Sequence, residues 1–127
     1  MKISAVIFTL IGVSSATSWG ADCYDEKLDA SGLLTANCDA GDGQGTRNAT
    51  SIDLNKCFGW DGQKIADMPN GNYSESCTDC TLNRLVYRLP IYKKQVWMNC
   101  TCGEPAVDAA LNTDRTRLDN VYGVLTC

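Results

Sequence analysis

The chain has 127 residues, enough for one domain or for two small modules that share a core. Its formal net charge is −4 and it has no large basic cluster, which excludes nucleic acids and anionic membranes as expected partners because acidic chains repel phosphate groups. Histidine is absent, so the common catalytic triads lack their base, and no spacing of acidic residues supports a glycosidase pair. We therefore expect a protein that is not an enzyme.

The first twenty residues have the composition of a secretory signal peptide. Lys2 precedes an apolar run at 3–13, and residues 14–16 and 18–20 each offer small residues at the positions that a signal peptidase reads. The run is too short to span a bilayer, and no later segment approaches eighteen apolar residues. We expect a signal at 1–20 and a secreted, extracellular chain at 21–127, with its mature start between residues 17 and 22.

Eight cysteines follow the signal: Cys23, Cys38, Cys57, Cys77, Cys80, Cys100, Cys102 and Cys127. An even number in an oxidising compartment indicates four disulfides. The alternative is that Cys77-x-x-Cys80 and Cys100-x-Cys102 bind zinc or act in redox chemistry. The absence of histidine and of a thioredoxin-like pattern disfavours it. We expect no metal and no cofactor.

Glycine and proline interrupt the mature chain every eight to fifteen residues. The short segments between them are rich in β-branched, leucine and aromatic residues, often alternating with polar ones, which is typical of strands. The segments of strand length are 33–37, 51–54, 81–87, 95–99 and 121–126. Only residues 104–111 have helical composition, and they amount to a turn or two. The predicted fold class is mostly β.

The chain also contains an internal repeat anchored on cysteines. The motifs that follow Cys23 and precede Cys38 return around Cys77 and Cys100. The offset between the copies is 54 residues at the first cysteine and 62 at the second, which predicts an eight-residue insertion within 83–95. A duplicated module should carry a duplicated bridge, so the repeat predicts the disulfides Cys23–Cys38 and Cys77–Cys100.

An ordered series of motifs carries a resemblance to a known family. The motifs are Leu-x-Ala-x-Cys at 34–38, Ser-Ile-Asp-Leu-Asn at 51–55, Asp-Gly at 61–62, Gly-Asn-Tyr-Ser-Glu-Ser-Cys at 71–77, and the turn at 118–125. Together they resemble the signature of cyanovirin-N homology domains, particularly those of filamentous fungi. The resemblance covers almost all of the mature chain. Trp60 stands near the asparagine that the signature expects, and the stretch 112–117 is polar where the signature is partly apolar.

The resemblance implies a fold of two tandem repeats, about 22–65 and about 71–127, intertwined into pseudo-symmetric modules. Each module would be a triple-stranded sheet plus a β-hairpin. Family members bind carbohydrate at one pocket per module, classically mannose-rich glycans, perform no chemistry on it, and occur as monomers or domain-swapped dimers. The expected partners are thus oligosaccharides or the glycans of glycoproteins. For the remaining cysteines we expect Cys57–Cys80 and Cys102–Cys127.

Six residues match the family's pocket motifs: Asn72, Glu75 and Ser76 in the middle of the chain, and Asp22, Asp39 and Asn120 in the outer module. A neutral sugar presents hydroxyl groups, so its pocket needs short polar side chains on a rigid rim. The alternative is that these residues only satisfy the backbone of turns. Tyr73 and Trp60 could stack on a sugar, although an aromatic residue in a small β domain more often belongs to the core.

Three N-glycosylation sequons begin at Asn48, Asn72 and Asn99. Asn48 lies in a glycine-rich region and is the most accessible by sequence, whereas a glycan on Asn72 would obstruct the middle pocket. The leading hypothesis is a secreted lectin-like protein. The alternative is a secreted effector on the same fold, with degenerate sugar sites and a protein partner that contacts residues 89–97.

Overall fold

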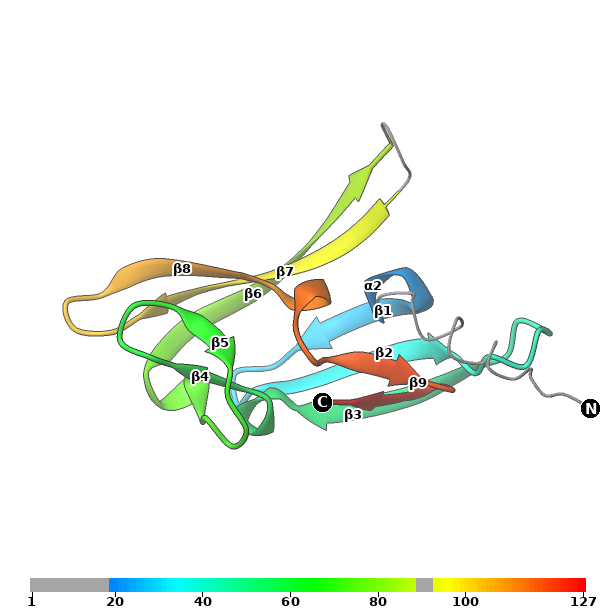
Figure 1. The fold of residues 1–127 in the computed structure, drawn as a ribbon, viewed down its shortest axis with the longest axis horizontal. Helices are drawn as coiled ribbons and strands as arrows, with labels where there is room; N and C mark the ends of the chain where they lie inside the picture. Colours follow the sequence, from blue (N-terminus) through cyan, green and yellow to red (C-terminus); the bar gives the residue numbers. More distant parts are fainter. Residues whose placement is uncertain (1–18, 89–92) are drawn as a thin grey trace, which may run out of the picture.

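The computed structural model describes residues 19–88 and 93–127 (Figure 1), so residues 1–18 of the expected signal lie outside them. The described chain is mostly β, as predicted. Its elements are α2 (Trp19–Asp22), β1 (Cys23–Leu28), β2 (Leu33–Asp39), β3 (Arg47–Asp53), η2 (Leu54–Lys56), β4 (Phe58–Trp60), β5 (Ile65–Asp67), η3 (Tyr73–Glu75), β6 (Cys77–Tyr87), β7 (Lys93–Cys102), β8 (Val107–Asn112), η4 (Thr113–Arg115), β9 (Asp119–Val121) and β10 (Val124–Thr126). No helix in this part of the chain has the length and apolar character needed to cross a membrane.

Two antiparallel sheets, β1–β2–β3 and β6–β7–β8, share one design. In each, the first strand begins with a cysteine opposite a cysteine and then bulges, and an aspartate in the bulge adopts a left-handed backbone: Asp25 at φ 57° and Asp79 at φ 54°. A 3-10 turn follows the third strand, with Asp53 capping η2 and Asn112 capping η4. The predicted pseudo-symmetry is confirmed.

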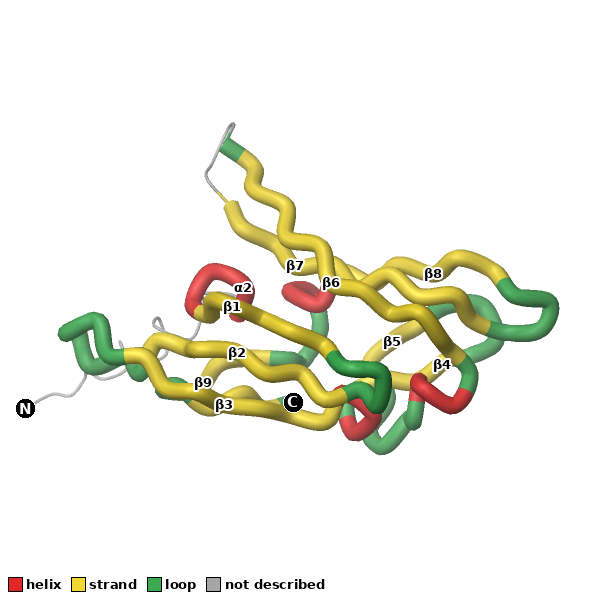
Figure 2. Tube along the Cα trace, turned by 180° about the vertical axis from the view of Figure 1, so that it is seen from behind, coloured by secondary structure: helices red, strands yellow, loops and turns green. Residues whose placement is uncertain are grey.

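Each sheet packs against a hairpin from elsewhere in the chain. The C-terminal hairpin β9–β10 contacts β3, and the hairpin β4–β5 contacts β8. We call β1–β2–β3 with β9–β10 the outer module, and β4–β5 with β6–β7–β8 the middle module. Figures 1 and 2 show the C-terminal strands lying along the first sheet. The intertwining of a triple-stranded sheet and a hairpin in each module is as expected.

The core is built from the inward faces of the two central strands. Leu34 in β2 and Val96 and Met98 in β7 are fully buried, because alternate residues of a strand point to the same face. A large aromatic residue precedes each sheet by four positions and fills the core: Trp19 in α2 is 0% exposed and Tyr73 in η3 is 1% exposed. Tyr73 makes an edge-to-face contact with Phe58, so it is a core residue and not a sugar-stacking platform.

Four disulfides join the eight cysteines, and one expected pair is correct, Cys23–Cys38. The other three expected pairs are wrong, because the observed bridges are Cys57–Cys127, Cys77–Cys102 and Cys80–Cys100. The register of β6 against β7 places Cys77 opposite Cys102, the true counterpart of Cys23 opposite Cys38. Cys80–Cys100 is a second bridge across the same two strands, where the outer module has Glu26 and Ala36.

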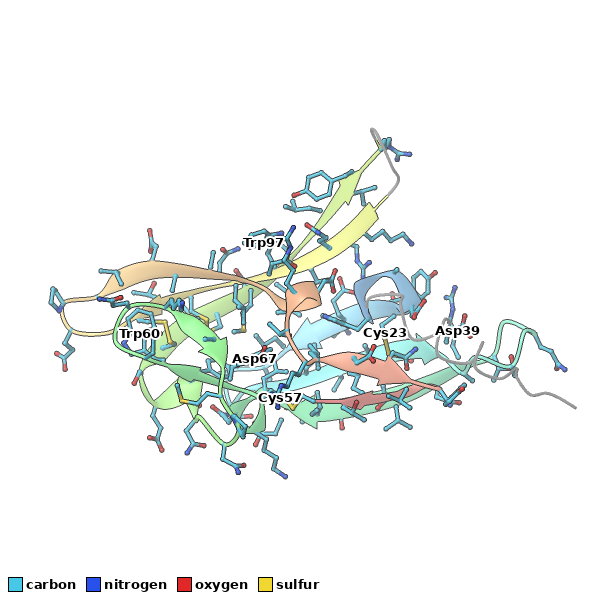
Figure 3. The ribbon with its side chains drawn as sticks, viewed as in Figure 1. Cys23, Asp39, Cys57, Trp60, Asp67 and Trp97 are labelled. Atoms are coloured by element: carbon cyan, nitrogen blue, oxygen red, sulfur yellow. A yellow bond between two sulfur atoms is a disulfide. The ribbon has the colours of Figure 1, made fainter. Side chains whose placement is uncertain are left out.

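The bridge Cys57–Cys127 follows from the intertwining. Cys57 comes directly after η2 at the end of the first sheet, and the C-terminal hairpin returns alongside β3 of that sheet. Figure 3 shows Cys57 in the middle of the molecule, near the C-terminal strands. A separation of 70 residues gives no local cue to this pairing.

The insertion in the second copy has ten residues rather than the expected eight. Its location within 83–95 agrees with the structure. Cys77 is offset from Cys23 by 54 residues, and Cys102 is offset from Cys38 by 64. The extra residues extend β6 and β7 beyond Leu82 and Met98, into a two-stranded arm that projects away from both modules (Figure 1). Residues 89–92 of the expected insertion lie outside the described residues.

The helical expectation for residues 104–111 is wrong, since residues 107–112 form β8. The segment pairs with β7 over its whole length, with Leu111 opposite Met98 and Ala109 opposite Cys100. Its alanine-rich composition favours a helix locally, but the unpaired edge of β7 supplies backbone hydrogen bonds that a one-turn helix cannot match. The other predicted strand segments fall within or overlap observed strands.

A polar cluster joins the two modules behind the core. Arg84, at the base of the arm, forms a two-pronged salt bridge with Glu26 and donates to the carbonyl oxygens of Gly20 and Cys23. Asp114 accepts hydrogen bonds from the backbone N–H groups of Gly20 and Val96. Burial raises the pKa of Asp114 to about 6, even though its hydrogen bonds and Arg84 act in the opposite direction.

Candidate functional site

The Cys23–Cys38 disulfide brings two predicted site residues together in the outer module. Asp22 directly precedes Cys23 and Asp39 directly follows Cys38, and the two cysteine Cα atoms are 4.0 Å apart. The side chain of Asn120 then links this end of the sheet to the C-terminal hairpin, because its Nδ2 donates to the Asp39 carbonyl oxygen at 3.0 Å. Asp22, Asp39 and Asn120 therefore meet at one corner, which we call the outer corner.

Several side-chain hydrogen bonds at the outer corner are made to the backbone of the corner itself. Asn120 Oδ1 accepts from Gly123 N at 2.8 Å, so both ends of the Asn120 amide are engaged. Asp39 Oδ1 accepts from Gly41 N at 2.9 Å and shapes the start of the loop 40–46, which Ala40 N closes by donating to the Thr46 carbonyl oxygen. Asn120 thus supports the backbone of the corner on both sides. The Asp39 carboxylate retains acceptor capacity for a ligand hydroxyl.

Tyr122 is a residue at this corner that the sequence reasoning missed. It occupies a left-handed position, φ 50°, in the turn between β9 and β10, and it is 61% exposed. Its ring lies against Gly41, where a Cβ atom would approach Tyr122 Cδ1 to 2.9 Å. The exposed aromatic ring beside polar groups is the kind of surface on which a sugar ring packs. A tyrosine between a valine and a glycine in a predicted turn was the available signal.

Asn72, Glu75 and Ser76 also lie together, around η3 of the middle module, and all three are exposed. Asn72 adopts a left-handed backbone at φ 51°, its carbonyl oxygen accepts from Glu75 N, and its own N–H donates to Asn55. The carbonyl oxygen of Ser76 accepts from Gly103 N at 3.0 Å, which ties η3 to the turn between β7 and β8. We call this the middle corner.

Trp60 completes the middle corner. Its indole lies against Gly103, where a Cβ atom would come within 3.2 Å of Trp60 Cζ2 and the positive φ of 84° already favours glycine. Gly103 directly follows Cys102 as Asp39 follows Cys38, so Trp60 beside Gly103 takes the place of Asn120 beside Asp39. Figure 3 shows Asp39 and Trp60 toward opposite ends of the long axis, so the two corners face apart.

A sequence model of the CVNH domain matches residues 19–126. The chain belongs to the CVNH family. No curated protein matches it significantly in sequence. The resemblance stated from the motifs is thereby confirmed, and the match begins at Trp19, the first of the described residues, which is buried in the core.

Solved structures share the fold of this CVNH domain. A designed cyanovirin-N homolog lectin, LKAMG, has a TM-score of 0.70 at 20% identity, covering 87% of this chain and 98% of its own. The CVNH protein of Gibberella zeae has a TM-score of 0.64 at 20% identity, covering 85% and 94%. A MoCVNH3 variant, solved in complex with (N-GlcNAc)4, has a TM-score of 0.65 at 16% identity, covering 88% and 97%.

The three sequons of the CVNH domain differ in their surroundings. Asn48 is exposed on β3, and its side chain lies directly against Gly123 of the outer corner. Asn72 is held in the middle corner. Asn99 lies on the central strand β7, with hydrogen-bonded neighbours on both sides. Among residues 19–88 and 93–127, no group of His, Cys, Asp and Glu side chains is arranged to hold a metal ion.

Proposed function

We propose that this CVNH domain is a secreted carbohydrate-binding protein, whose outer corner is its principal sugar site. The observation that carries the proposal is the convergence of Asp22 and Asp39 through one disulfide, beside the exposed ring of Tyr122. The carboxylates can accept hydrogen bonds from vicinal hydroxyls, and the ring offers an apolar surface to the C–H face of a sugar. Family membership and a fold neighbour in complex with (N-GlcNAc)4 support the ligand class.

The middle corner is the second proposed site, with Asn72, Glu75 and Ser76 as hydrogen-bonding groups. Trp60 adds an aromatic surface that the outer corner lacks at the equivalent position. No chemistry on the sugar is proposed. Two sites facing apart cannot both contact one short glycan, so strong binding would require a polyvalent glycan or a dimer, domain-swapped or not, rather than a single monomer site.

Titration of the isotopically labelled secreted protein with mannobiose and with the tetramer of N-acetylglucosamine tests the proposal. We expect amide shifts at Asp39, Gly41 and Tyr122 for the outer corner, and at Glu75 and Ser76 for the middle corner. The sugar that produces them identifies whether mannose-rich or chitin-like glycans are preferred. The absence of shifts at both corners across an oligosaccharide panel would reject carbohydrate binding there.

The burial of Trp19 bears on the expected signal. Of the two small-residue motifs, the later one would place cleavage after Gly20 and would remove Trp19, which is 0% exposed and donates to Thr113 Oγ1 at 3.1 Å. We therefore propose cleavage at the earlier motif, so that the mature chain retains Trp19. Mass measurement of the secreted protein would reveal the N-terminal residue, and a chain starting at Ala21 would contradict this assignment. The four disulfides agree with an extracellular location.

We also propose that Asn48 is the modified sequon. Because its side chain lies against Gly123, a glycan there would stand beside the outer corner, so the sugar titration is run on deglycosylated protein. Asn48 is exposed on an edge strand, whereas Asn99 lies in the middle of a sheet. The mass shift on treatment with a peptide N-glycosidase, compared between wild type and Asn48→Gln, would locate the glycan. An unchanged shift in the variant would place it elsewhere.

The exposed arm favours a second candidate function, an interaction with another protein. Leu85, Val86 and Tyr87 are 41%, 42% and 41% exposed at the end of β6. Three consecutive exposed apolar residues on a projecting strand are unusual for a monomer surface. The interaction protein is the better description if neither corner binds any glycan and the wild type binds an extracellular protein that a Leu85→Ser, Tyr87→Ser variant does not bind.

A further inference from the structure

The outward face of the first sheet carries a hollow of about 750 Å³ that belongs to neither corner. It is open to solvent and is floored by the central strand β2. Leu34 and Ala36 point from β2 into the core, so the alternate residues Thr35 and Asn37 point out into the hollow. We call this hollow the sheet cup. Its size falls in the range of small-molecule sites in proteins, which are about 300–1,000 Å³.

The sheet cup is lined by an ordered row of polar groups. Lys27 on β1, Thr35 on β2 and Ser51 on β3 lie opposite one another in the register, so an ammonium and two hydroxyl groups cross the sheet in a line. Neighbouring strands are about 4.8 Å apart, so these groups are spaced on the scale of one sugar ring. Such a row can both donate to and accept from ring hydroxyls.

A carboxylate and an amide stand beside this row. Asp25 leaves the regular strand in the β-bulge, and its Oδ2 accepts from Asn37 Nδ2 at 3.3 Å. The hydrogen bond orients the Asn37 amide and uses one of the acceptor positions of the carboxylate. The remaining acceptor positions and the second amide hydrogen are suited to a pair of vicinal hydroxyls. Lys27 balances the charge of Asp25, and Glu26, the other carboxylate of the lining, is paired with Arg84. The lining therefore favours a neutral ligand over an anion or a cation.

A stacked pair of side chains separates the sheet cup from the outer corner. Arg47 lies opposite Asp39 in the register, and its guanidinium carbon is 3.8 Å from the centre of the Tyr24 ring on β1. The Arg47 side chain therefore crosses β2 between Asn37, which lines the cup, and Asp39, which ends the strand. A ligand in the cup and a ligand at the corner would contact different residues.

The second sheet has a hollow at the same register positions, and its chemistry differs. It measures about 400 Å³, and Asp79, Thr81, Asn99 and Thr101 replace Asp25, Lys27, Thr35 and Asn37. The position of Lys27 is therefore taken by a neutral threonine, and Asp108 adds another carboxylate to the lining. The hollow thus follows from the shape of the sheet, whereas the charge-balanced lining is particular to the first sheet.

We propose that the sheet cup is a third saccharide site, which binds one unit of a neutral glycan through Asp25, Asn37, Lys27, Thr35 and Ser51. The inference rests on the proposed function for its class of ligand. A glycan chain longer than the outer corner can hold would then have a second, independent contact on the same module.

The same titration, with mannobiose and with the tetramer of N-acetylglucosamine, tests this proposal when the side-chain amide of Asn37 and the backbone amides of Thr35 and Ser51 are followed. We expect these signals to shift. In Asn37→Ala, the affinity obtained from the shifts at Thr35 and Ser51 should fall by about tenfold or more, because the variant loses hydrogen bonds of the pair that Asn37 forms with the charged Asp25. Thr101→Ala, at the equivalent position of the second sheet, is the matched control and should leave the cup affinity unchanged. Ser51→Ala provides a second disruption on another strand.

The outcomes separate this proposal from the proposed function. Shifts at Asp39 and Tyr122 without shifts at Thr35 and Ser51 would overturn the sheet cup and leave the corner intact. Shifts at the cup that persist in Asp39→Ala would support the cup as an independent site. Shifts at Thr35 that vanish equally in Asp39→Ala and Asn37→Ala would show a single site at the corner and would overturn the cup. No shifts anywhere would overturn both.

Discussion

The two modules have the same backbone plan, yet their corners are chemically different. In the outer module the residue that follows the Cys23–Cys38 disulfide is Asp39, whose carbonyl oxygen accepts a hydrogen bond from the Asn120 amide. In the middle module the equivalent residue is Gly103, covered by the Trp60 indole. The position after the disulfide is therefore acidic in one module, and in the other it is a glycine covered by an aromatic ring. A shared fold does not make the two sites equivalent, because each corner is completed by a hairpin with its own sequence.

The difference extends to the short helical segments that support the corners. Trp19 in the outer module and Tyr73 in the middle module occupy the same position, four residues before the first cysteine of a sheet. The next residue in each segment donates its N–H to a side chain: Gly20 donates to Asp114 in the outer module, and Ser74 donates to the neutral Asn55 in the middle module. An ionisable anchor therefore supports only the outer corner, and stability should depend on pH there in a way that has no counterpart in the middle module.

The largest expected effect comes from Trp19, the buried aromatic residue that supports the outer corner. Trp19→Ala should lower the free energy of unfolding by about 3–5 kcal/mol, because it empties a fully buried aromatic site and removes the hydrogen bond to Thr113. Denaturant unfolding followed by circular dichroism measures it. Tyr122→Ala, which removes an exposed ring, should change the value by no more than about 0.5 kcal/mol. A small effect of Trp19→Ala would mean that α2 is not part of the cooperative fold.

The second prediction concerns the bridge that only the middle module has. Replacing Cys80 and Cys100 together by serine should reduce stability by about 3 kcal/mol, because a crosslink separated by 20 residues no longer restricts the unfolded chain. The Cys77–Cys102 bridge remains and should preserve the register of the sheet. Unfolding of the double variant in urea measures the loss. If the variant instead matched the wild type, the second crosslink would be redundant with the first.

The third prediction uses the raised pKa of Asp114. Its ordinary value is 3.8 and burial raises the pKa to about 6 in the folded state, so the folded state binds the proton more tightly than the unfolded state. The resulting stabilisation is fully present below pH 4 and is lost as pH rises through 6. With allowance for solvent screening of a partly exposed group, we expect about 1–2 kcal/mol.

Urea unfolding at pH 4 and pH 7 tests it, with Asp114→Asn as the comparison. The difference in stability between the wild type and the variant should shift in favour of the wild type on acidification. A difference that is independent of pH would show that Asp114 titrates normally. Asp114→Asn keeps one oxygen acceptor at both pH values, as the protonated carboxyl group does, so the variant itself contributes no titration at this site.

The smallest expected effects separate the two corners by binding. Asp39→Ala should weaken sugar affinity at the outer corner by about tenfold, since a hydrogen bond to a charged group is lost, and should leave the signals of Glu75 and Ser76 unchanged. Trp60→Ala should do the reverse. Signal-by-signal titration of both variants measures this. Loss at both corners in either variant would mean that the two sites are coupled or that the variant is not folded.

Local features of the sequence were enough for much of this picture. The short strands follow from alternation, the Cys23–Cys38 bridge from the internal repeat, and the pseudo-symmetric pair of modules from the resemblance to the family. In the structure the two cysteines lie opposite each other in a short antiparallel hairpin. The grouping of Asp22 with Asp39 follows from that bridge. The pairing Cys77–Cys100 failed because a cysteine two residues along the strand, Cys102, occupies the equivalent register position.

Other features depended on contacts between distant segments. The composition of residues 107–112 favours a helix, and only the free edge of β7 makes the segment a strand. Tyr122 becomes part of a candidate site because the C-terminal hairpin brings it against Gly41. The support that Asn120 gives to the backbone of the corner is visible only from the two hydrogen bonds of its amide.

The sequence by itself determined the family, the class of fold and the residue types at each corner, because these are written in motifs of a few neighbouring residues. The tertiary structure alone decided two details of how the halves are joined: the Cys57–Cys127 bridge, and the replacement of the Asn120–Asp39 contact by Trp60 and Gly103. The physical reason is that these contacts span tens of residues and depend on the register and packing of whole sheets, which local patterns do not encode.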